Sequence, residues 1–432
     1  MMISSPWRDS FWGVGTRMRT NYGCTARAYL DNAAAPQVAE PAALKIRRAL
    51  PRYACGGGPD RLSEEMREKC EAVRAAVLNY VGGDPEKDAA VFTSSATAAV
   101  NLLSSLLRQA DPGQVGITTR MEHLADFLPF RERFHTALVE MTADGKIDLD
   151  DYRRLLVKYE GKAGLVAVTA GSNVTGVVPP VHRMAELAHE YGAKILVDAA
   201  QAVQHRPFSM RPHADRGHLD FLVFSGRKCY AGRAGGVLVG PKEFLNSFRP
   251  ALYGAGVADF VSDEEIAYRE APARYEAGGP DCLGVLALGE ALRFLKKVGL
   301  ARIAEYEGNL YRYLLRRLRE VPGVVLYGAP DEANHLPIAA FNLQGVSFRD
   351  LGDALGYDYG VAVIVAQRVA VAAGTCGADL CVQDLLKLSD AQACALFRNG
   401  RGYGVVRASL APFNSSDDVD RLANALRRVA GG

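Results

Sequence analysis

Apolar runs of strand length alternate with amphipathic segments of helical length from residue 89 onward in this 432-residue chain. The apolar runs lie near residues 89–93, 115–118, 165–169, 194–198, 220–224 and 235–239. Helical periodicity lies between them, near residues 96–108, 147–159 and 181–191. Strands that alternate with helices predict an α/β fold, in which a mainly parallel sheet carries helices on both faces.

The pattern changes after Gly278-Gly279-Pro280. A long helical stretch is expected over residues 283–319. Further strands are expected at residues 324–327, 338–343 and 405–410, and a last helix from Ser416. We therefore predict a large domain over residues 29–284 and a smaller α+β domain over residues 285–432.

The segment before residue 89 carries weaker signals. Residues 1–28 show no clear period and are expected to form a loose N-terminal arm that could pack on the smaller domain. A short strand and turn are expected over residues 28–36. A capping pattern predicts that a helix begins at Ser63, and Gly82 marks its end.

Composition and charge narrow the class of protein. The chain is 49% hydrophobic and 23% charged, with a net charge of +2, which is typical of a globular protein and not of a nucleic-acid or membrane-surface binder. No apolar run reaches the roughly 18 residues that span a membrane, and no signal-peptide core is present at the N-terminus. We expect a cytoplasmic protein without nucleic-acid or membrane partners.

The eight cysteines are scattered without Cys-x-x-Cys spacing. Such scatter indicates neither a zinc site nor a disulfide framework, so no metal is expected. Reduced thiols are the default for a cytoplasmic protein.

The strand expected near residues 220–224 is followed by a turn that contains Lys228. It runs through Ser225-Gly226 to Lys228, and a glycine-rich turn then leads into the next strand. Desolvation and the like charges of Arg227 and Arg233 would favour the neutral amine, which can attack a carbonyl and hold an aldehyde cofactor as a Schiff base. The alternative from the residues alone is an exposed turn lysine.

A second segment favours the cofactor interpretation. The strand over 194–198 ends in Asp198, where open α/β sheets bind ligands, and Gln201 follows shortly after. Pyridoxal phosphate requires such a carboxylate to keep its ring nitrogen protonated. With Lys228 downstream, the chain resembles the fold-type I, class V pyridoxal-phosphate enzymes, closest to group II cysteine desulfurases and selenocysteine lyases.

This resemblance implies a set of phosphate ligands and a dimer. The turn Phe92–Ala99 opens a helix whose free N–H groups suit a phosphate, although the residues alone would equally fit an ordinary N-cap. Ser95, Ala96 and Thr97 match the family's phosphate cradle. Ser225 matches a further ligand, and Arg227 stands where the family usually has histidine. Gly279 lies in a segment that, in the family, reaches the partner's phosphate across a homodimer.

The resemblance also implies which residues contact the pyridine ring of the cofactor and which contact the substrate. His123 matches the histidine that stacks on the ring and moves protons, and Gln201 matches the residue that binds the phenolic oxygen. Asn173 matches a contact to both cofactor and substrate. Arg407 matches the arginine that pairs with the substrate's α-carboxylate, for which a bidentate guanidinium is suited.

The match to the family's persulfide cysteine is the weakest. Group II desulfurases carry an Arg-x-Gly-x-x-Cys-like loop, whereas Ala372 replaces the arginine and Cys376 comes one position early. Cys376 could still present the thiolate, and Arg368 could replace the lost cation. The alternative is that Cys376 and Cys381 are packing residues.

The sequence thus predicts a cysteine desulfurase that forms L-alanine and an enzyme persulfide from L-cysteine. Its catalytic residues would be Lys228, His123 and Cys376, and its partners a small amino acid, a second copy and a sulfur-acceptor protein. A class V lyase, transaminase or epimerase acting on another amino acid without a persulfide is the alternative. A third hypothesis is a non-catalytic partner protein that keeps the fold.

Overall fold

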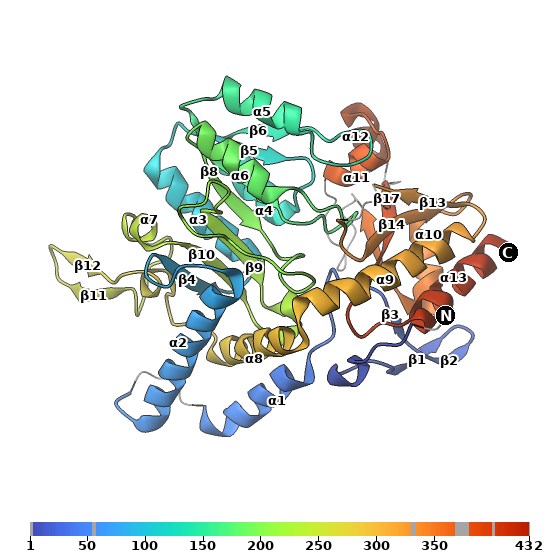
Figure 1. Ribbon diagram of the computed structural model, residues 1–432, viewed down its shortest axis with the longest axis horizontal. Helices are drawn as coiled ribbons and strands as arrows, with labels where there is room; N and C mark the ends of the chain where they lie inside the picture. Colours follow the sequence, from blue (N-terminus) through green and yellow to red (C-terminus); the bar gives the residue numbers. More distant parts are fainter. Residues whose placement is uncertain are drawn as a thin grey trace.

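Two sheets, each packed between helices, make up most of the computed structural model (Figure 1). The structure describes residues 3–53, 58–328, 330, 334–367, 380–399 and 402–431. The seven-stranded sheet belongs to the middle of the chain, and the four-stranded sheet to its last part. No helix within these ranges has the length and apolar composition needed to cross a membrane.

The larger sheet is mainly parallel, as the sequence predicted. Its strands, in spatial order, are β4 (Asp88–Thr93), β10 (Gly236–Pro241), β9 (Phe221–Ser225), β8 (Lys194–Asp198), β7 (Ala163–Thr169), β5 (Val115–Thr119) and β6 (His135–Val139). Only β10 runs antiparallel to its neighbours β4 and β9. The sequence analysis missed β6, because this edge strand is partly exposed and lacks a continuous apolar run.

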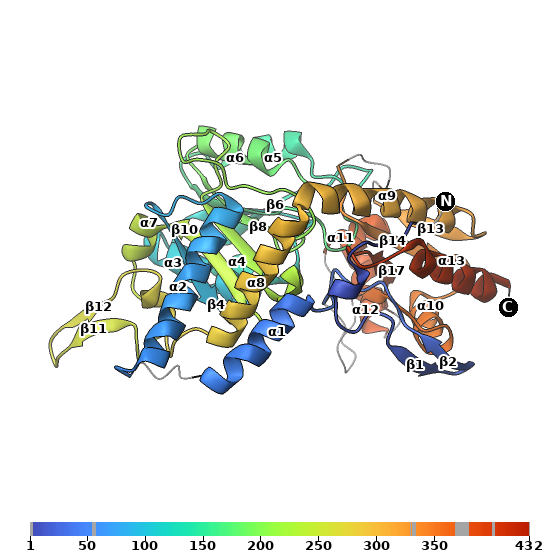
Figure 2. The ribbon, with the colours of Figure 1, turned by 60° about the horizontal axis from the view of Figure 1, so that its bottom comes forward.

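Helices cover both faces of the larger sheet. Alternate residues of β4 show this: Ala90 and Phe92 pack into one core, and Ala89 and Val91 pack into another. The first face is covered by α1 (Glu40–Ala49), α2 (Arg61–Val81), α5 (Leu149–Lys158), α6 (Val181–Glu190) and α8 (Cys282–Val298). The second face is covered by α3 (Ala96–Ala110), α4 (Leu124–Arg133) and α7 (Lys242–Asn246). Figure 2 shows α1, α2 and α8 side by side.

The smaller sheet is antiparallel throughout. Its strands, in spatial order, are β13 (Val324–Tyr327), β14 (Ile338–Leu343), β17 (Gly404–Ser409) and β16 (Ile364–Gln367). One face packs on α9 (Leu300–Arg319), α10 (Phe348–Asp353) and α13 (Ser416–Gly431). The other face packs on α11 (Leu380–Leu385) and α12 (Asp390–Arg398). The sequence analysis did not predict β16.

Two helix boundaries differ from the expectation. The stretch predicted as continuous over residues 283–319 is broken at Gly299, whose φ of 92° does not suit a helix. The helix expected to begin at Ser63 begins at Arg61 instead, because Asp60 is the N-cap and accepts from the Leu62 and Ser63 amides. Its end at Gly82, with a φ of 69°, was predicted correctly.

The N-terminal arm is not loose. It forms a hairpin of β1 (Arg17–Thr20) and β2 (Gly23–Ala26), and β3 (Ala28–Tyr29) pairs with β15 (Val361–Ala362). The Asn21 amide donates to the Tyr357 carbonyl at 2.8 Å, so the hairpin rests on the later part of the chain. Its elements are polar, and these distant contacts rather than a local apolar pattern order them.

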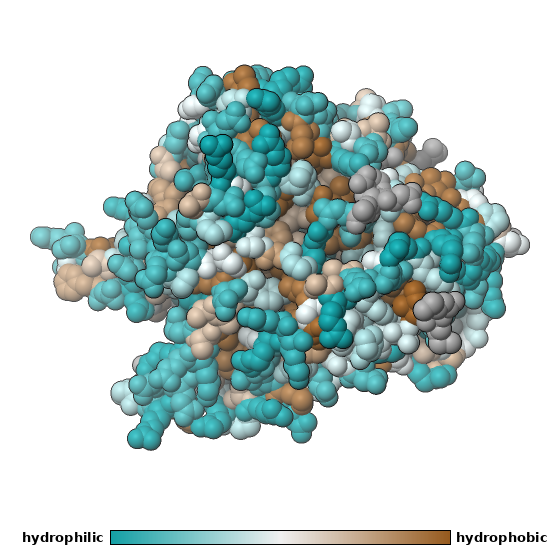
Figure 3. Space-filling view, viewed as in Figure 1, coloured by the Kyte–Doolittle hydropathy of each residue, from teal (hydrophilic) through white to brown (hydrophobic). Residues whose placement is uncertain are grey.

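A second hairpin, of β11 (Ala258–Val261) and β12 (Ile266–Tyr268), projects from the larger sheet at the left of Figure 1. Figure 3 shows apolar residues on it within a mostly hydrophilic face. Phe260 and Val261 are more than half exposed, at 55% and 65%.

Candidate active site

The site residues gather where the parallel strands of the larger sheet end. Register pairs Asp198 of β8 with Thr169 of β7 and with Val223 of β9. The turns after these strands therefore bring Asn173 and Lys228 to one edge with Asp198. His123 reaches the same edge from the turn after β5, which pairs with β7.

Lys228 sits on a short π-helical turn, Arg227–Ala231, directly after β9. The Gly226 amide donates to the Gly235 carbonyl at 2.7 Å, and a Cβ at Gly226 would lie 2.7 Å from that of Ala234, so only glycine permits this tight return. Tyr230 completes the turn with a φ of 63°. The turn thus presents Lys228 at a defined place beside the sheet edge.

The charges around Lys228 are more mixed than the sequence suggested. Arg227 and Arg233 are both exposed. The carboxyl groups of Asp31 and Asp126 lie close enough for the Lys228 ammonium to stabilise their charge. Neither acid was singled out from the sequence. Asp31 lies within the strand and turn expected over residues 28–36, and Asp126 lies in the first turn of α4.

Asp198 and Gln201 are both buried at this edge. Asp198 is 9% exposed, and its Oδ1 accepts from the Ala200 amide at 2.8 Å. Gln201 donates from Nε2 to the Ala33 carbonyl at 2.7 Å, while its Oε1 is buried without a partner among the described residues. A buried amide with unused hydrogen-bonding capacity indicates a ligand that completes it.

The N-terminus of α3 lies beside β10 and has backbone amides that the helix does not use. Ser95 is the N-cap, and its Oγ accepts from the Ala98 amide at 3.1 Å. The Ala96 and Thr97 amides precede the first intrahelical bond and are available to an anion. A Cβ at Gly236 would lie 2.2 Å from the Ser95 carbonyl carbon, so this glycine lets the turn pack on β10. Ser225, the last residue of β9, pairs with Gly236 and so lies next to this turn.

Arg407 reaches the site from the smaller sheet. It is 2% exposed, and its Nη1 donates to the Asn173 carbonyl at 2.5 Å while Nη2 donates to Asp31 Oδ1 at 3.3 Å. Its Nε is buried without a partner within the described part of the chain. Burial raises the pKa of Asp31, and Arg407 opposes this rise. Asp31 therefore orients the guanidinium, and Arg407 keeps donor capacity for a carboxylate.

His123 is the N-cap of α4, and its Nδ1 accepts from the Ala125 amide at 3.0 Å. Since Nδ1 acts as an acceptor, the neutral ring carries its proton on Nε2. This tautomer leaves Nε2–H as the group that can exchange a proton.

Gly279 and Arg227 are exposed in the single chain. Gly279 lines a cavity of about 690 Å³ together with Thr93 and Ser94 of the turn before α3. Nearby Glu276 is held by Arg74, with Nη1 to Oε1 at 2.8 Å, and accepts from the Phe92 amide at 2.7 Å. The segment that carries Gly279 is therefore tied to the strand that leads into the turn before α3.

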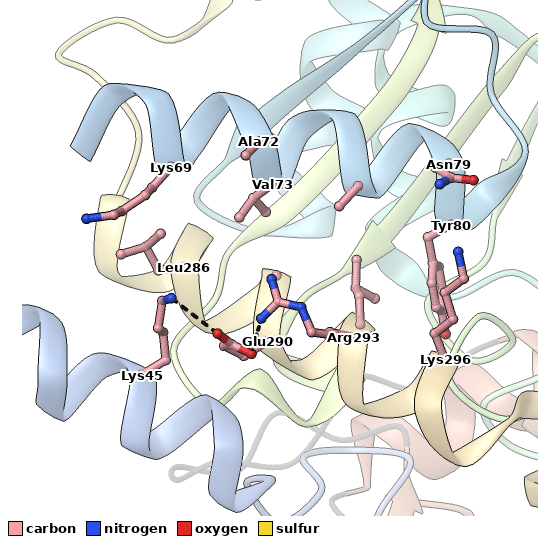
Figure 4. A pocket seen from close by; sticks show the side chains of 13 residues that line it. Lys45, Lys69, Ala72, Val73, Asn79, Tyr80, Leu286, Glu290, Arg293 and Lys296 are labelled. Atoms are coloured by element: carbon pink, nitrogen blue, oxygen red, sulfur yellow. Dashed lines mark hydrogen bonds and ion pairs between the residues drawn. The ribbon is translucent and has the colours of Figure 1, made fainter. Parts of the chain in front are cut away.

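Another groove lies between α1, α2 and α8 (Figure 4). Its volume is about 280 Å³, and Glu290 on its floor pairs with Lys45 at 3.2 Å and with Arg293 at 2.5 Å. None of the site residues predicted from the sequence lines it, so we do not assign the chemistry to this groove.

The predicted persulfide thiol, Cys376, lies outside the described residues, as do Arg368 and Ala372. The side chain of Cys381 is also outside them. The assignment of Cys376 therefore still rests on the sequence.

The donor set fits a phosphorylated pyridine aldehyde. A buried carboxylate suits a ring nitrogen, a helix N-terminus suits a phosphate, and a lysine suits an aldehyde. The unused hydrogen-bonding capacity of Gln201 and of Arg407 is accounted for by such a cofactor and by a carboxylate substrate.

Known proteins resemble the chain over almost its whole length. The family profile described as aminotransferase class-V matches residues 28–422. A cysteine desulfurase of Klebsiella pneumoniae (strain 342) is 33% identical over 413 residues, 93% of each chain. A cysteine desulfurase of Escherichia coli O127:H6 is 33% identical over 414 residues, again 93% of each chain.

Solved structures agree with this likeness. The apo structure of a cysteine desulfurase from Thermococcus onnurineus NA1 has a TM-score of 0.80 and 28% identity, and covers 94% of this chain and 95% of its own. The cysteine desulfurase CsdA from Escherichia coli has a TM-score of 0.78 and 24% identity, with 98% of both chains covered, and supports the fold alone.

Proposed function

The chain belongs to the aminotransferase class-V family, and from this premise we propose that it is a pyridoxal-phosphate-dependent cysteine desulfurase. It would convert L-cysteine to L-alanine and transfer the sulfur to one of its own cysteines. The observation that carries the proposal is the convergence of Asp198, Lys228 and the buried donor of Arg407 on one edge of the larger sheet. The named desulfurase relatives support the choice of substrate.

The cofactor would be held at three points. Asp198 accepts from the ring nitrogen, Gln201 bonds the phenolic oxygen, and the Ala96 and Thr97 amides with Ser95 and Ser225 hold the phosphate. Arg227 adds a guanidinium to the phosphate from the turn. When bound, pyridoxal phosphate withdraws electrons from the bond that breaks at the substrate.

Lys228 and His123 would move the protons. The Lys228 amine would hold the aldehyde carbon of the cofactor and be freed once the substrate is bound. It then transfers a proton at the substrate α-carbon, within the low-dielectric edge of the sheet. Nε2 of His123 is the second proton-exchanging group.

Arg407 and Asn173 would hold the substrate. The guanidinium pairs with the α-carboxylate through the donors that Asn173 and Asp31 leave unused. This pairing would fix the substrate between the two sheets, because Arg407 comes from the smaller sheet and Asn173 follows a strand of the larger one.

Cys376 would receive the sulfur. Its thiolate attacks the substrate Sγ, an S–S bond forms, and the Cβ–Sγ bond breaks. The electron pair stays on the carbon skeleton, which gains protons to become alanine. A thiol reductant or an acceptor protein then removes the sulfur and restores the thiolate, and the reducing cytoplasm is where we place this activity.

The test is to mix the purified protein and cofactor with L-cysteine and a reductant, and to measure sulfide and alanine together. Equal amounts are expected from the wild type, and about a hundredfold less or lower from Cys376→Ala, because the nucleophile is absent. Cys394→Ala removes an exposed thiol of α12 and is the matched control that should keep the rate.

Other outcomes decide between the alternatives. A full rate in Cys376→Ala with loss in Cys381→Ala would move the sulfur acceptor to Cys381. Turnover that requires a keto acid and releases no sulfide would show a transaminase, and no cofactor uptake at all would favour a non-catalytic protein.

We also propose that the protein is a homodimer. Large apolar side chains are exposed on one side of the larger sheet, at Leu252, Tyr253, Phe260, Val261 and Ile266. The exposed Gly279 and the 690 Å³ cavity lie beside the phosphate turn, where a second copy could complete the site. Light scattering of the purified chain would show twice the chain mass, and a monomer would contradict the proposal.

A further inference from the structure

A buried carboxyl group lies beside Asp198 and has no role so far. Asp126 is the third residue of α4 and is 1% exposed. Neither of its carboxyl oxygens has a hydrogen-bond donor within the described ranges. The Asp126 carboxyl group lies within hydrogen-bonding reach of the Asp198 carboxyl group. A hydrogen bond between two carboxyl groups requires that one of them carries a proton.

The position of Asp126 on α4 does not explain its burial. An acid at the third helical position ordinarily reaches back to cap the free amides of the first turn. In α4 the cap is supplied by His123, whose Nδ1 takes the Ala125 amide, and the Asp126 amide donates to the His123 carbonyl at 2.9 Å. The Asp126 side chain takes no part in the cap and is directed at β8 instead.

The surrounding charges decide its protonation. Burial raises the pKa of Asp126 well above its ordinary value, the negative charges of Asp198 and Glu122 add to the rise, and Lys228 opposes it. The helix N-terminus favours the ionised form by only about 0.3–1 kcal/mol. This gain is too small to offset burial and the neighbouring negative charges, so Asp126 is the group expected to keep a proton.

We propose that Asp126 is a positioning residue that keeps this proton and donates it as a hydrogen bond to Asp198, leaving Asp198 ionised to receive the ring nitrogen of the cofactor. The inference rests on the proposed function only for the identity of that cofactor. The pair then carries a single negative charge, which matches the single positive charge of a protonated ring nitrogen. A neutral buried acid that serves as a hydrogen-bond donor has precedent in enzyme sites.

The pair also fixes the orientation of Asp198. Oδ1 of Asp198 accepts from the Ala200 amide at 2.8 Å, and a donor at Asp126 holds the carboxylate from the side of α4. With two fixed donors, the carboxylate cannot rotate away from the ring. Without the second donor, Asp126 would be a buried repulsive charge next to it.

Two variants separate a donor from a mere space filler. Asp126→Asn keeps the size and supplies an N–H to Asp198 at any pH, whereas Asp126→Leu fills the space without a donor. In the cofactor-free protein, infrared spectroscopy at neutral pH should detect a protonated carboxylic acid in the wild type that both variants lack. Equilibrium binding should show that pyridoxal phosphate binds Asp126→Asn nearly as well as the wild type, and Asp126→Leu about ten- to a hundredfold more weakly.

The pH dependence of unfolding gives an independent measure. Because the native pKa of Asp126 is raised, the folded protein keeps a proton that the unfolded chain releases, so stability falls as pH rises above the ordinary range of an aspartic acid. Asp126→Asn lacks this group. Its gain in melting temperature over the wild type should therefore grow from acid to neutral pH. Asp144→Asn, at an exposed turn, is the control of opposite sign, because hydrogen bonds from Thr142 and Lys146 lower the pKa of Asp144.

Two results would overturn the inference. One is a folded Asp126→Leu protein that binds the cofactor as tightly as Asp126→Asn; the other is a wild type without a protonated-acid signal. None of these measurements uses cysteine. A protein that binds the cofactor but does not desulfurate cysteine would therefore leave this inference standing. A protein that desulfurates cysteine but shows either of the two results above would overturn this inference and leave the proposed function standing.

Discussion

The two sides of the candidate site are built in different ways. On the cofactor side, Asp198 and Lys228 follow neighbouring parallel strands whose register is set by backbone hydrogen bonds. On the substrate side, Arg407 comes from the other sheet and is placed by its bonds to the Asn173 carbonyl and Asp31. The cofactor side is therefore positioned within one sheet, whereas the substrate side depends on how the two sheets pack together.

A short segment after β3 joins the two sides. The Ala33 carbonyl accepts from Gln201 at 2.7 Å, and the Ala33 amide donates to Ser409 Oγ of β17 at 2.9 Å. Asn32 adds a buried bond to the Ser409 carbonyl at 2.8 Å. This stretch of backbone therefore couples the residues proposed to hold the cofactor with those proposed to hold the substrate.

The largest effect is expected on the cofactor side. Lys228→Ala should lower the rate of alanine formation by roughly a thousandfold or more, since an acid–base group contributes about 10²–10⁴ and the covalent anchor is also lost. The visible absorbance of the bound cofactor should change as well. Lys158→Ala, at the exposed end of α5, is the control. A Lys228→Ala enzyme with normal turnover would remove this lysine from the chemistry.

A smaller and more selective effect is expected at Arg407. Arg407→Lys keeps a charge but cannot bond Asn173, Asp31 and a carboxylate together. The KM for cysteine should rise about ten- to a hundredfold, the worth of a hydrogen bond to a charged group, while the cofactor's Kd stays constant. Steady-state kinetics and cofactor titration measure the two. An equal loss of cofactor affinity would contradict the division into two sides.

The smallest effect is expected at the joining segment. Asn32→Ala removes the bonds to the Ser409 carbonyl and to Asn414 Oδ1, at 2.8 and 3.0 Å, and should destabilise the fold by about 1–3 kcal/mol. The KM for cysteine should rise by less than in Arg407→Lys. Denaturant unfolding and kinetics check both values. Asn424→Ala, on the outer side of α13, provides the matched control.

The sequence was most informative where strands are buried on both faces. Such strands are continuous apolar runs, so β7, β8 and β9 were predicted close to their observed bounds. The edge strand β6 was missed because it is partly exposed and lacks a continuous apolar run. The edge strand β16 was also missed, although Ile364, Val365 and Ala366 are apolar. The hairpin of residues 17–26 was missed because distant backbone contacts, such as that of Asn21 with Tyr357, order it.

The sequence by itself determined the residues whose partners are set by strand order. Asp198 ends a buried strand and Lys228 follows the next one, and strand ends coincide in a parallel sheet, so the sequence could place them together. The role of Gln201 came from the family resemblance, and the chemical roles of all three residues stay predictions.

Only the tertiary structure showed which residues of different elements contact one another, because no local sequence pattern connects those elements. It placed Asp31 against Arg407 and Asp126 against Asp198, and in each case the two residues belong to different elements. The physical reason is that burial and like-charge proximity change what a carboxyl group does, and both arise from packing alone. In the sequence, Asp31 and Asp126 are ordinary acids, and the fold makes one a partner of an arginine and the other a holder of a proton.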